Sequence, residues 1–268
     1  MNCYPHGCAA SDGSLSMGVF DFLKGDGKKD AESAPPGDGI TLKKKKDVAE
    51  KEFTLLKKKA DVVVAELGLT GQRARVALAV DISGSMNQMF RAGTVQRVVE
   101  RILALAMKFD DNGAIDVFLF GVNDYECGEL NESGFYGYVE REIIAKRKLE
   151  NGTRYAGVMQ RILEKYTAEK GDPAYVMFLT DGDNGDVAQS EKVIIEASRH
   201  AVFWQFIGIG IASFEFLQQL DTMSGRFIDN ANFFKVNDLD KITDDDLYRR
   251  MLGEFPAWLK LAKQHGLW

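Results

Sequence analysis

The stretch Arg75-Val-Ala-Leu-Ala-Val-Asp-Ile-Ser-Gly-Ser85 joins an apolar run to a short polar segment. The run 75–80 is apolar after its first residue, without the polar alternation of a half-exposed strand, so it predicts a strand buried on both faces. Asp81, Ser83 and Ser85 follow where this strand would end. Ligands of an open parallel sheet bind beyond the carboxyl ends of its strands. The stretch therefore predicts a buried parallel strand with a polar site at its end.

Apolar strands and amphipathic helices alternate along the chain after this stretch. The alternation predicts an α/β fold, in which a mostly parallel sheet is covered by helices on both faces. The predicted strands are residues 75–80, 115–120, 126–130, 174–179, 202–209 and 233–236. The predicted helices are residues 94–109, 136–146, 155–166, 187–200, 214–223, 239–252 and 257–265, and residues 110–113 form a turn.

Residues 1–39 precede this pattern, and their composition predicts a disordered, low-complexity tail. They hold seven glycines and three of the five prolines, so they cannot bury enough apolar surface to offset the entropy lost on folding. A single apolar island begins at Met17. We interpret Met17, rather than Met1, as the natural start of the protein.

The segment 40–70 is a lysine-rich lead-in. The stretch from Lys43 to Lys59 contains eight lysines and three acidic residues. Residues 40–42 predict a short strand, and apolar residues at helical spacing from 53 to 67 predict a helix that ends at Gly68. The lysines are interpreted as a solvated helix face whose other side packs on the domain, with a binding patch for an anionic partner as the alternative.

The composition excludes several classes of protein. The chain has 268 residues, with 34 Lys and Arg against 40 Asp and Glu, and this net charge of −6 argues against a protein that coats nucleic acid. Three cysteines (Cys3, Cys8 and Cys127) do not make a disulfide scaffold. No apolar run reaches the ~18 residues of a membrane span, and the N-terminus lacks a secretory signal pattern. We expect a soluble, cytoplasmic protein that binds no nucleic acid.

Five oxygen-bearing side chains are predicted to form a metal site. Asp81, Ser83 and Ser85 follow the first strand, Thr153 precedes the helix 155–166, and Asp181 follows the strand 174–179. If the first and fourth strands are neighbours, Asp81 and Asp181 face the same crevice. Carboxylate and hydroxyl oxygens suit Mg²⁺, with Ca²⁺ or Mn²⁺ as alternatives, and no His or Cys accompanies them to favour zinc.

The five residues lie in three motifs: Asp81-Ile-Ser-Gly-Ser85, Gly152-Thr153 and Thr180-Asp-Gly182. Together these motifs resemble the metal-ion-dependent adhesion site of a von Willebrand factor type A (vWA) domain. The resemblance covers residues 75 to 236 and implies a doubly wound, mostly parallel sheet of six strands with one short antiparallel edge strand, for which 126–130 is the candidate. It also implies roles for the site residues. Positions matching Ser83, Ser85 and Thr153 commonly bind the metal directly, and those matching Asp81 and Asp181 often act through water.

The flanks of this region resemble those of bacterial tellurium-resistance (Ter-type) stress proteins. The resemblance is carried by Ile40-Thr-Leu-Lys-Lys44 and by Glu254-Phe-Pro-Ala-Trp-Leu-Lys260. It implies a cytoplasmic protein that acts by binding partners in a stress response and is not an enzyme. The expected organisation is a vWA domain over 71–238, followed by C-terminal helices over 239–268 that pack on it.

The leading functional hypothesis is a divalent-metal-dependent protein-binding module, in which an Asp or Glu of a partner completes the coordination sphere. The alternative is a Mg²⁺-dependent phosphohydrolase or phosphotransferase on a similar sheet. Such enzymes place a second acid two residues after a nucleophilic Asp, and here that position is Ser83. A third hypothesis has the segment 43–59 docking acidic partners or membrane phosphate without a metal.

Overall fold

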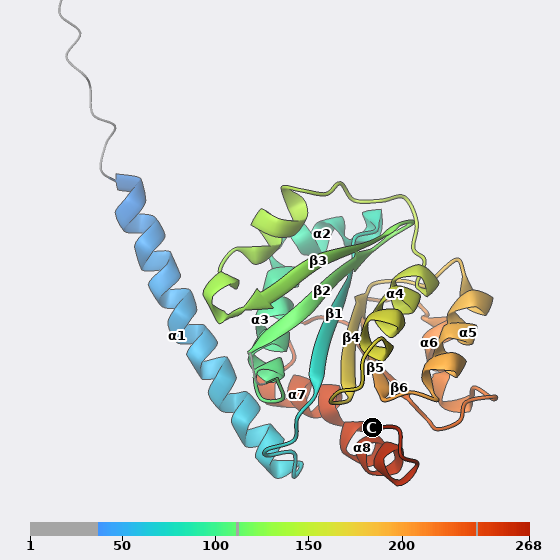
Figure 1. The fold of residues 1–268 in the computed structure, drawn as a ribbon. Helices are drawn as coiled ribbons and strands as arrows, with labels where there is room; N and C mark the ends of the chain where they lie inside the picture. The colour runs from blue at the N-terminus through green and yellow to red at the C-terminus, as the bar shows by residue number, and fades with distance from the viewer. Residues whose placement is uncertain (1–36, 111–112, 240) are drawn as a thin grey trace, which may run out of the picture.

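The computed structural model describes residues 37–110, 113–239 and 241–268. The predicted tail lies outside these residues over 1–36, as does part of the predicted turn at 110–113. Figure 1 shows a twisted sheet with helices on both faces and a long helix, α1, beside it. The strands are β1 (Arg75–Asp81), β2 (Ala114–Phe120), β3 (Asp124–Asn131), β4 (Ala174–Thr180), β5 (Val202–Ile209) and β6 (Ala231–Val236).

The helices alternate with these strands. They are α1 (Gly37–Glu66), α2 (Asn87–Arg91), α3 (Thr94–Ala106), α4 (Ala156–Thr167), α5 (Val187–Ala197), α6 (Glu215–Gln218), α7 (Asp244–Leu252) and α8 (Phe255–Gln264). Short 3₁₀ turns lie at Gly84–Met86, Glu132–Gly134 and Leu220–Thr222, and a π-helical turn at Val139–Ile144. Within the described ranges, no helix combines the length and apolar composition needed to cross a membrane.

The sheet has the strand order β3-β2-β1-β4-β5-β6. β1 pairs in parallel with both β2 and β4, and β3 pairs antiparallel with β2 at the edge. The chain therefore winds outward from β1 in both directions, and the strand order reverses between β1 and β4. The doubly wound fold, the antiparallel edge strand and the neighbouring first and fourth strands are all confirmed.

The alternation of β1 side chains between the two faces of the sheet determines the face on which Asp81 lies. Val76, Leu78 and Val80 face the core beneath α1, α3 and α8, whereas Ala77 and Ala79 face the core beneath α4 and α5. Successive side chains of a strand point to opposite faces. Asp81, two residues after Ala79, accordingly continues the row on the α4 face.

The prediction of a strand at 40–42 is wrong, because α1 begins at Gly37 and runs through these residues. The tail boundary at 39 shifts for the same reason. Leu, Lys, Ala and Glu, which have high helix propensity, continue from residue 42. The predicted end is confirmed: Gly68 has φ +69°, and the Leu69 N–H donates to the Val64 carbonyl at 2.9 Å.

One face of α1 packs on the domain and the other carries the lysines. Phe53, Ala60 and Val63 are buried, and Phe53 stacks on Phe135 at 4.5 Å. Residues 41–48 are all exposed. Lys57 pairs with Glu132 and Lys59 with Asp244. Lys46 pairs with Glu50. The other lysines of α1, which form no ion pair with the described residues, are Lys43, Lys44, Lys45, Lys51 and Lys58.

Two predicted helices in the second half are shorter than expected. The helix predicted for 239–252 starts only at Asp244, because the Thr243 hydroxyl accepts a hydrogen bond from the Asp246 N–H (3.2 Å) and caps it there. The helix predicted for 214–223 is divided into α6 and a 3₁₀ turn. Hydrophobic spacing locates a helix but does not fix its ends.

The C-terminal helix α8 covers the sheet through an aromatic cluster. Phe255 is fully buried, and its ring centroid lies 4.5 Å from that of Tyr175 and 5.7 Å from those of Phe203 and Trp258. Phe109, just after α3, packs edge-on against Phe255 at 5.8 Å. α8 therefore closes one face of the same core to which the central strands contribute.

Candidate metal centre

The loop after β1 folds back on the last residue of the strand. The Ser83 N–H donates to Asp81 Oδ1 at 2.7 Å, and the Ile82 N–H donates to the Phe120 carbonyl at 2.8 Å. A 3₁₀ turn at Gly84–Met86 follows. Asp81 is fully buried, so its carboxylate forms the floor of the site and fixes the backbone at Ser83.

A row of hydrogen-bonded oxygens links β1 to β4. Ser83 Oγ lies 3.0 Å from Ser85 Oγ, and the Ser85 hydroxyl donates to Asp181 Oδ1 at 2.8 Å. Asp181 immediately follows β4. Four of the five predicted residues therefore meet where the strand order reverses, as a parallel sheet requires of side chains at the ends of neighbouring strands.

The loop that carries Thr153 is anchored to the same place by its backbone. The Gly84 N–H donates to the Glu150 carbonyl, and the Glu150 N–H donates to the Ile82 carbonyl, each at 2.8 Å. The Thr153 carbonyl accepts from the Gly185 N–H at 2.9 Å. The Thr153 hydroxyl makes no hydrogen bond to the other four side chains in the described structure. The structure brings this loop to the site, and ligation by Thr153 stays a prediction.

Two supporting residues were not predicted. The Thr180 hydroxyl donates to Asp81 Oδ2 at 2.7 Å. The Tyr155 hydroxyl donates to the Gly182 carbonyl at 2.5 Å and lies 3.2 Å from Thr180 Oγ1. Thr180 belongs to the Thr-Asp-Gly motif, which was a usable signal, whereas Tyr155 is indistinguishable by sequence from its apolar neighbours on the α4 stripe.

The carboxylate of Glu150 was also missed. It accepts hydrogen bonds from the Asn123 N–H (2.8 Å) and the Tyr125 hydroxyl (2.7 Å). A Cβ atom on Gly121 would lie 2.8 Å from Glu150 Cβ, so a larger residue there would displace Glu150. Glu150 thereby ties the Thr153 loop to the connection between β2 and β3.

The electrostatics of the two aspartates favour a cation. Burial raises the pKa of Asp81 to about 6, although hydrogen bonds from Ser83 and Thr180 oppose the rise. Burial also raises the pKa of Asp181. Neither carboxylate pairs with a Lys, Arg or His in the described residues. Two carboxylates, two hydroxyls and no resident cationic side chain are a donor set that fits a hard divalent cation.

The candidate site contains only two carboxylates among its five predicted ligands, Asp81 and Asp181. No group of three or more His, Cys, Asp or Glu side chains that could hold a metal ion occurs in the part of the chain that the structure describes. A cation held by Asp81 and Asp181 would therefore take its other protein ligands from hydroxyl or backbone oxygens.

Replacement of Asp81 by Asn is expected to change how stability depends on pH in protein freed of divalent cations. Because burial raises the pKa of Asp81 from 3.8 to about 6, the folded state binds more protons than the unfolded state between these values. The free energy of unfolding of the wild type therefore falls as pH rises through this window. At about 1.4 kcal/mol per pH unit, the loss is roughly 3 kcal/mol.

Asparagine does not titrate, so Asp81→Asn should gain roughly 3 kcal/mol relative to wild type between about pH 4 and about pH 7. Urea denaturation of both proteins in EDTA at the two pH values measures this difference. The prediction fails if the difference between variant and wild type is the same at both.

The polar residues after Asp181 make hydrogen bonds within the local structure. The Asp186 carboxylate accepts from the Tyr155 N–H (2.9 Å) and the Ala156 N–H (3.0 Å), and so caps the start of α4. Asn184 is buried and donates to Asp186. Asp183 accepts from the Ser213 hydroxyl at 3.0 Å. These three residues therefore hold the loop between β4 and α5 against its neighbours.

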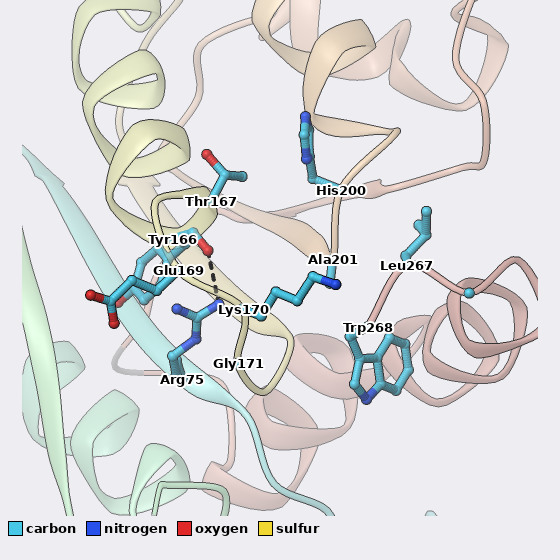
Figure 2. A pocket seen from close by; sticks show the side chains of 11 residues that line it. Arg75, Tyr166, Thr167, Glu169, Lys170, Gly171, His200, Ala201, Leu267 and Trp268 are labelled. Carbon is cyan, nitrogen blue, oxygen red and sulfur yellow. Dashed lines mark hydrogen bonds between the residues drawn. The ribbon is translucent and has the colours of Figure 1, made fainter.

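A separate cavity of about 360 Å³ lies at the opposite edge of the sheet, where β1 begins. Figure 2 shows Arg75 pointing toward the loop after α4 on one side, with His200 and Trp268 on the other. Arg75 donates to the carbonyls of Tyr166 (2.9 Å) and Asp172 (2.8 Å). None of the five predicted metal residues lines this cavity, and Arg75 serves there to hold the connection between α4 and β4.

Comparisons with known proteins agree with this geometry. A family model described as the vWA domain found in the TerF C terminus matches residues 73–268. The Bacillus subtilis protein YcbR is 47% identical over 199 residues, which cover 72% of this chain and 81% of YcbR. Copine-C of Dictyostelium discoideum is 24% identical over 253 residues, which cover 81% of this chain but only 44% of Copine-C.

Among solved structures, the SpRpn10 VWA domain superposes with a TM-score of 0.51 at 12% sequence identity. The match covers 66% of this chain and 95% of that domain. At this identity the likeness supports the fold alone.

Proposed function

Since this chain belongs to the family of vWA domains found at the C terminus of TerF, we propose that it is a divalent-metal-dependent protein-binding module. The proposed ligands are Asp81, Ser83, Ser85, Thr153 and Asp181, and the proposed cation is Mg²⁺, with Ca²⁺ or Mn²⁺ as alternatives. The observation that carries the proposal is the row of hydrogen-bonded oxygens from Ser83 through Ser85 to Asp181, above the buried carboxylate of Asp81.

The proposed ligands have different roles in such a site. Asp81 accepts from the Ser83 N–H and the Thr180 hydroxyl, and so holds the loop in one conformation and adds negative charge from below. Ser83 and Ser85 present neutral oxygens, which leave the net charge of the site low. A bound cation would supply an exchangeable coordination position to a carboxylate of the partner. The partner is therefore proposed to present an Asp or Glu at this edge of the sheet.

The proposed setting is a bacterial tellurium-resistance or stress-response system in the cytoplasm. It is supported by the resemblance of the flanking segments to Ter-type proteins and by the match to a family defined on TerF. We propose that the protein contributes binding rather than direct chemistry on tellurium compounds.

We further propose that the protein is not an enzyme. In the alternative, a Mg²⁺-dependent phosphohydrolase or phosphotransferase, an acid is needed two residues after Asp81. Ser83 stands there, and its hydroxyl lies against Ser85. A screen of the purified protein against phosphoesters in Mg²⁺ tests this proposal, and turnover that is lost in Asp81→Ala would contradict it.

Partner capture tests the proposed function. The full chain is used as bait in native cell extract, in Mg²⁺ or in EDTA, and bound proteins are identified by mass spectrometry. We expect a defined set that is retained in Mg²⁺, released by EDTA and absent with the double variant Asp81→Asn, Asp181→Asn. Asp246→Asn, at an exposed position on α7, is the matched control. A set that is indifferent to EDTA and to the double variant would contradict the proposal.

A further inference from the structure

A groove of about 470 Å³ opens beside the candidate metal centre, and Ser85 and Asp181 line both. One wall of the groove carries Met89 of α2, and the other carries Ile211 and Ala212 from the connection between β5 and α6. We refer to it as the side groove. Its continuity with the metal residues means that a partner carboxylate at the metal would bring its neighbouring side chains over this groove.

Ile211 stands out by its exposure. The residue is 92% exposed, and the other exposed large apolar residues that the structure describes range from 38% to 59%. An isoleucine in this position adds nothing to the core, and its removal from water is favourable when another surface covers it. It is therefore a candidate contact for a partner.

The backbone around Ile211 is held in place by its neighbours. The Gly210 N–H donates to the Val236 carbonyl (3.0 Å), and Gly210 has φ +98°. Lys235 Nζ donates to the Ala212 carbonyl at 2.7 Å. The Ser213 hydroxyl donates to Asp183 at 3.0 Å. Ile211 is thus presented to solvent by a connection that is fixed on both sides.

Phe214 ends this connection in an unusual conformation. It has φ +54° and is the one residue other than glycine with a positive φ among the described residues. Its ring is fully buried and packs against Phe233 at 5.4 Å. A Cβ on Gly208 would approach this ring to 2.9 Å. Backbone strain of this kind persists where the surroundings enforce it, and it gathers at functional sites.

The opposite wall is adaptable. Met89 is half-buried on α2, four residues after Ser85. Methionine has a flexible thioether side chain that adjusts to different apolar partners. No Lys or Arg lines the side groove. An isoleucine on a held backbone at one wall and a methionine at the other suit an aliphatic or aromatic side chain.

We propose that the side groove determines which carboxylate the metal centre accepts: the partner segment carries a bulky apolar residue within two positions of its Asp or Glu. This inference rests on the proposed function, since the carboxylate at the metal is what brings the segment to the groove. Adjacent residues of an extended chain are spaced by about 3.3 Å, so one segment reaches both places.

An array of immobilised peptides tests the inference with the full-length protein. Each peptide has a central Asp or a central Asn, and one of its four nearest positions is Leu or Ser. We expect binding to need the Asp and Mg²⁺, and Leu to strengthen it roughly tenfold. Ile211→Ser and Met89→Ser should reduce this advantage to about twofold or less. Leu55→Ser, at an exposed position of α1, is the matched control.

The outcomes separate the two proposals. Binding that needs Asp and Mg²⁺ but is indifferent to Leu overturns the inference and leaves the proposed function standing. Binding without Asp or Mg²⁺ dependence, or no binding, overturns both. Wild-type protein that self-associates in light scattering, with association lost in Ile211→Ser, identifies a second copy as the occupant and also overturns the inference. Calorimetry with Mg²⁺ alone checks that Ile211→Ser acts on the groove and not on the metal.

Discussion

Mg²⁺ at a hundredfold excess over its dissociation constant is expected to raise the unfolding temperature of the wild-type protein by roughly 5–10 °C. A ligand that binds only the folded state at this concentration stabilises it by about 2.7 kcal/mol. For a domain of this size, each kcal/mol shifts the unfolding temperature by about 2–4 °C. The double variant Asp81→Asn, Asp181→Asn should show no shift, because it removes both carboxylates that would balance the cation's charge.

Thermal unfolding with a Mg²⁺ titration measures this effect, and calorimetry gives the dissociation constant. Asn keeps the shape of Asp. Its amide oxygen can still accept from the Ser83 N–H, and its NH2 group can donate to the Thr180 hydroxyl oxygen in place of the hydrogen bond that Asp81 accepts, so the variant should fold. The control Asp246→Asn should shift as the wild type does. Equal shifts in the double variant and the wild type would mean that the cation binds elsewhere.

Phe255→Ala is expected to lower the free energy of unfolding by about 3–5 kcal/mol, the usual cost of truncating a buried aromatic side chain to alanine. Phe255 is fully buried and contacts the rings of Tyr175 and Phe203 on the sheet, as well as Trp258 on its own helix. Its loss leaves a cavity between α8 and the sheet. Urea denaturation, followed by tryptophan fluorescence, measures the change.

Phe227→Ala is the matched control, since Phe227 is 46% exposed and loses less contact on truncation. We expect its cost to be below about 1 kcal/mol. A cost for Phe255→Ala as small as that of the control would show that α8 does not contribute to the core, contrary to the packing described above.

The sheet and the centre of the site follow from local patterns in the sequence. β1 and β4 are apolar at nearly every position, which distinguishes strands buried on both faces from surface strands. Ligands of a parallel sheet bind beyond the carboxyl ends of neighbouring strands where the strand order reverses. This places Asp81 and Asp181 together, although they are 100 residues apart in the chain. Ser83 and Ser85 are expected at the same site because they follow Asp81 closely in the sequence.

Other features depend on contacts that no local pattern records. Tyr155, just before α4, reaches Thr180, the residue that donates to Asp81, only because α4 packs on the sheet. The conformation of Phe214 is enforced by its neighbours and runs against the intrinsic preference of phenylalanine for negative φ. Ile211 is apolar like the strand before it, and only the structure shows that its side chain leaves the core.

The N-terminal part of α1 stands clear of the sheet (Figure 1). Residues 41–48 are exposed throughout, and the 12 residues from Gly37 to Val48 span about 18 Å of helix. Trp268, at the other end of the described chain, lies by the cavity where the strands begin. A label or a resin attached at Trp268 would thus lie at the end of the strands opposite the centre between β1 and β4, which leaves that centre free for capture from solution.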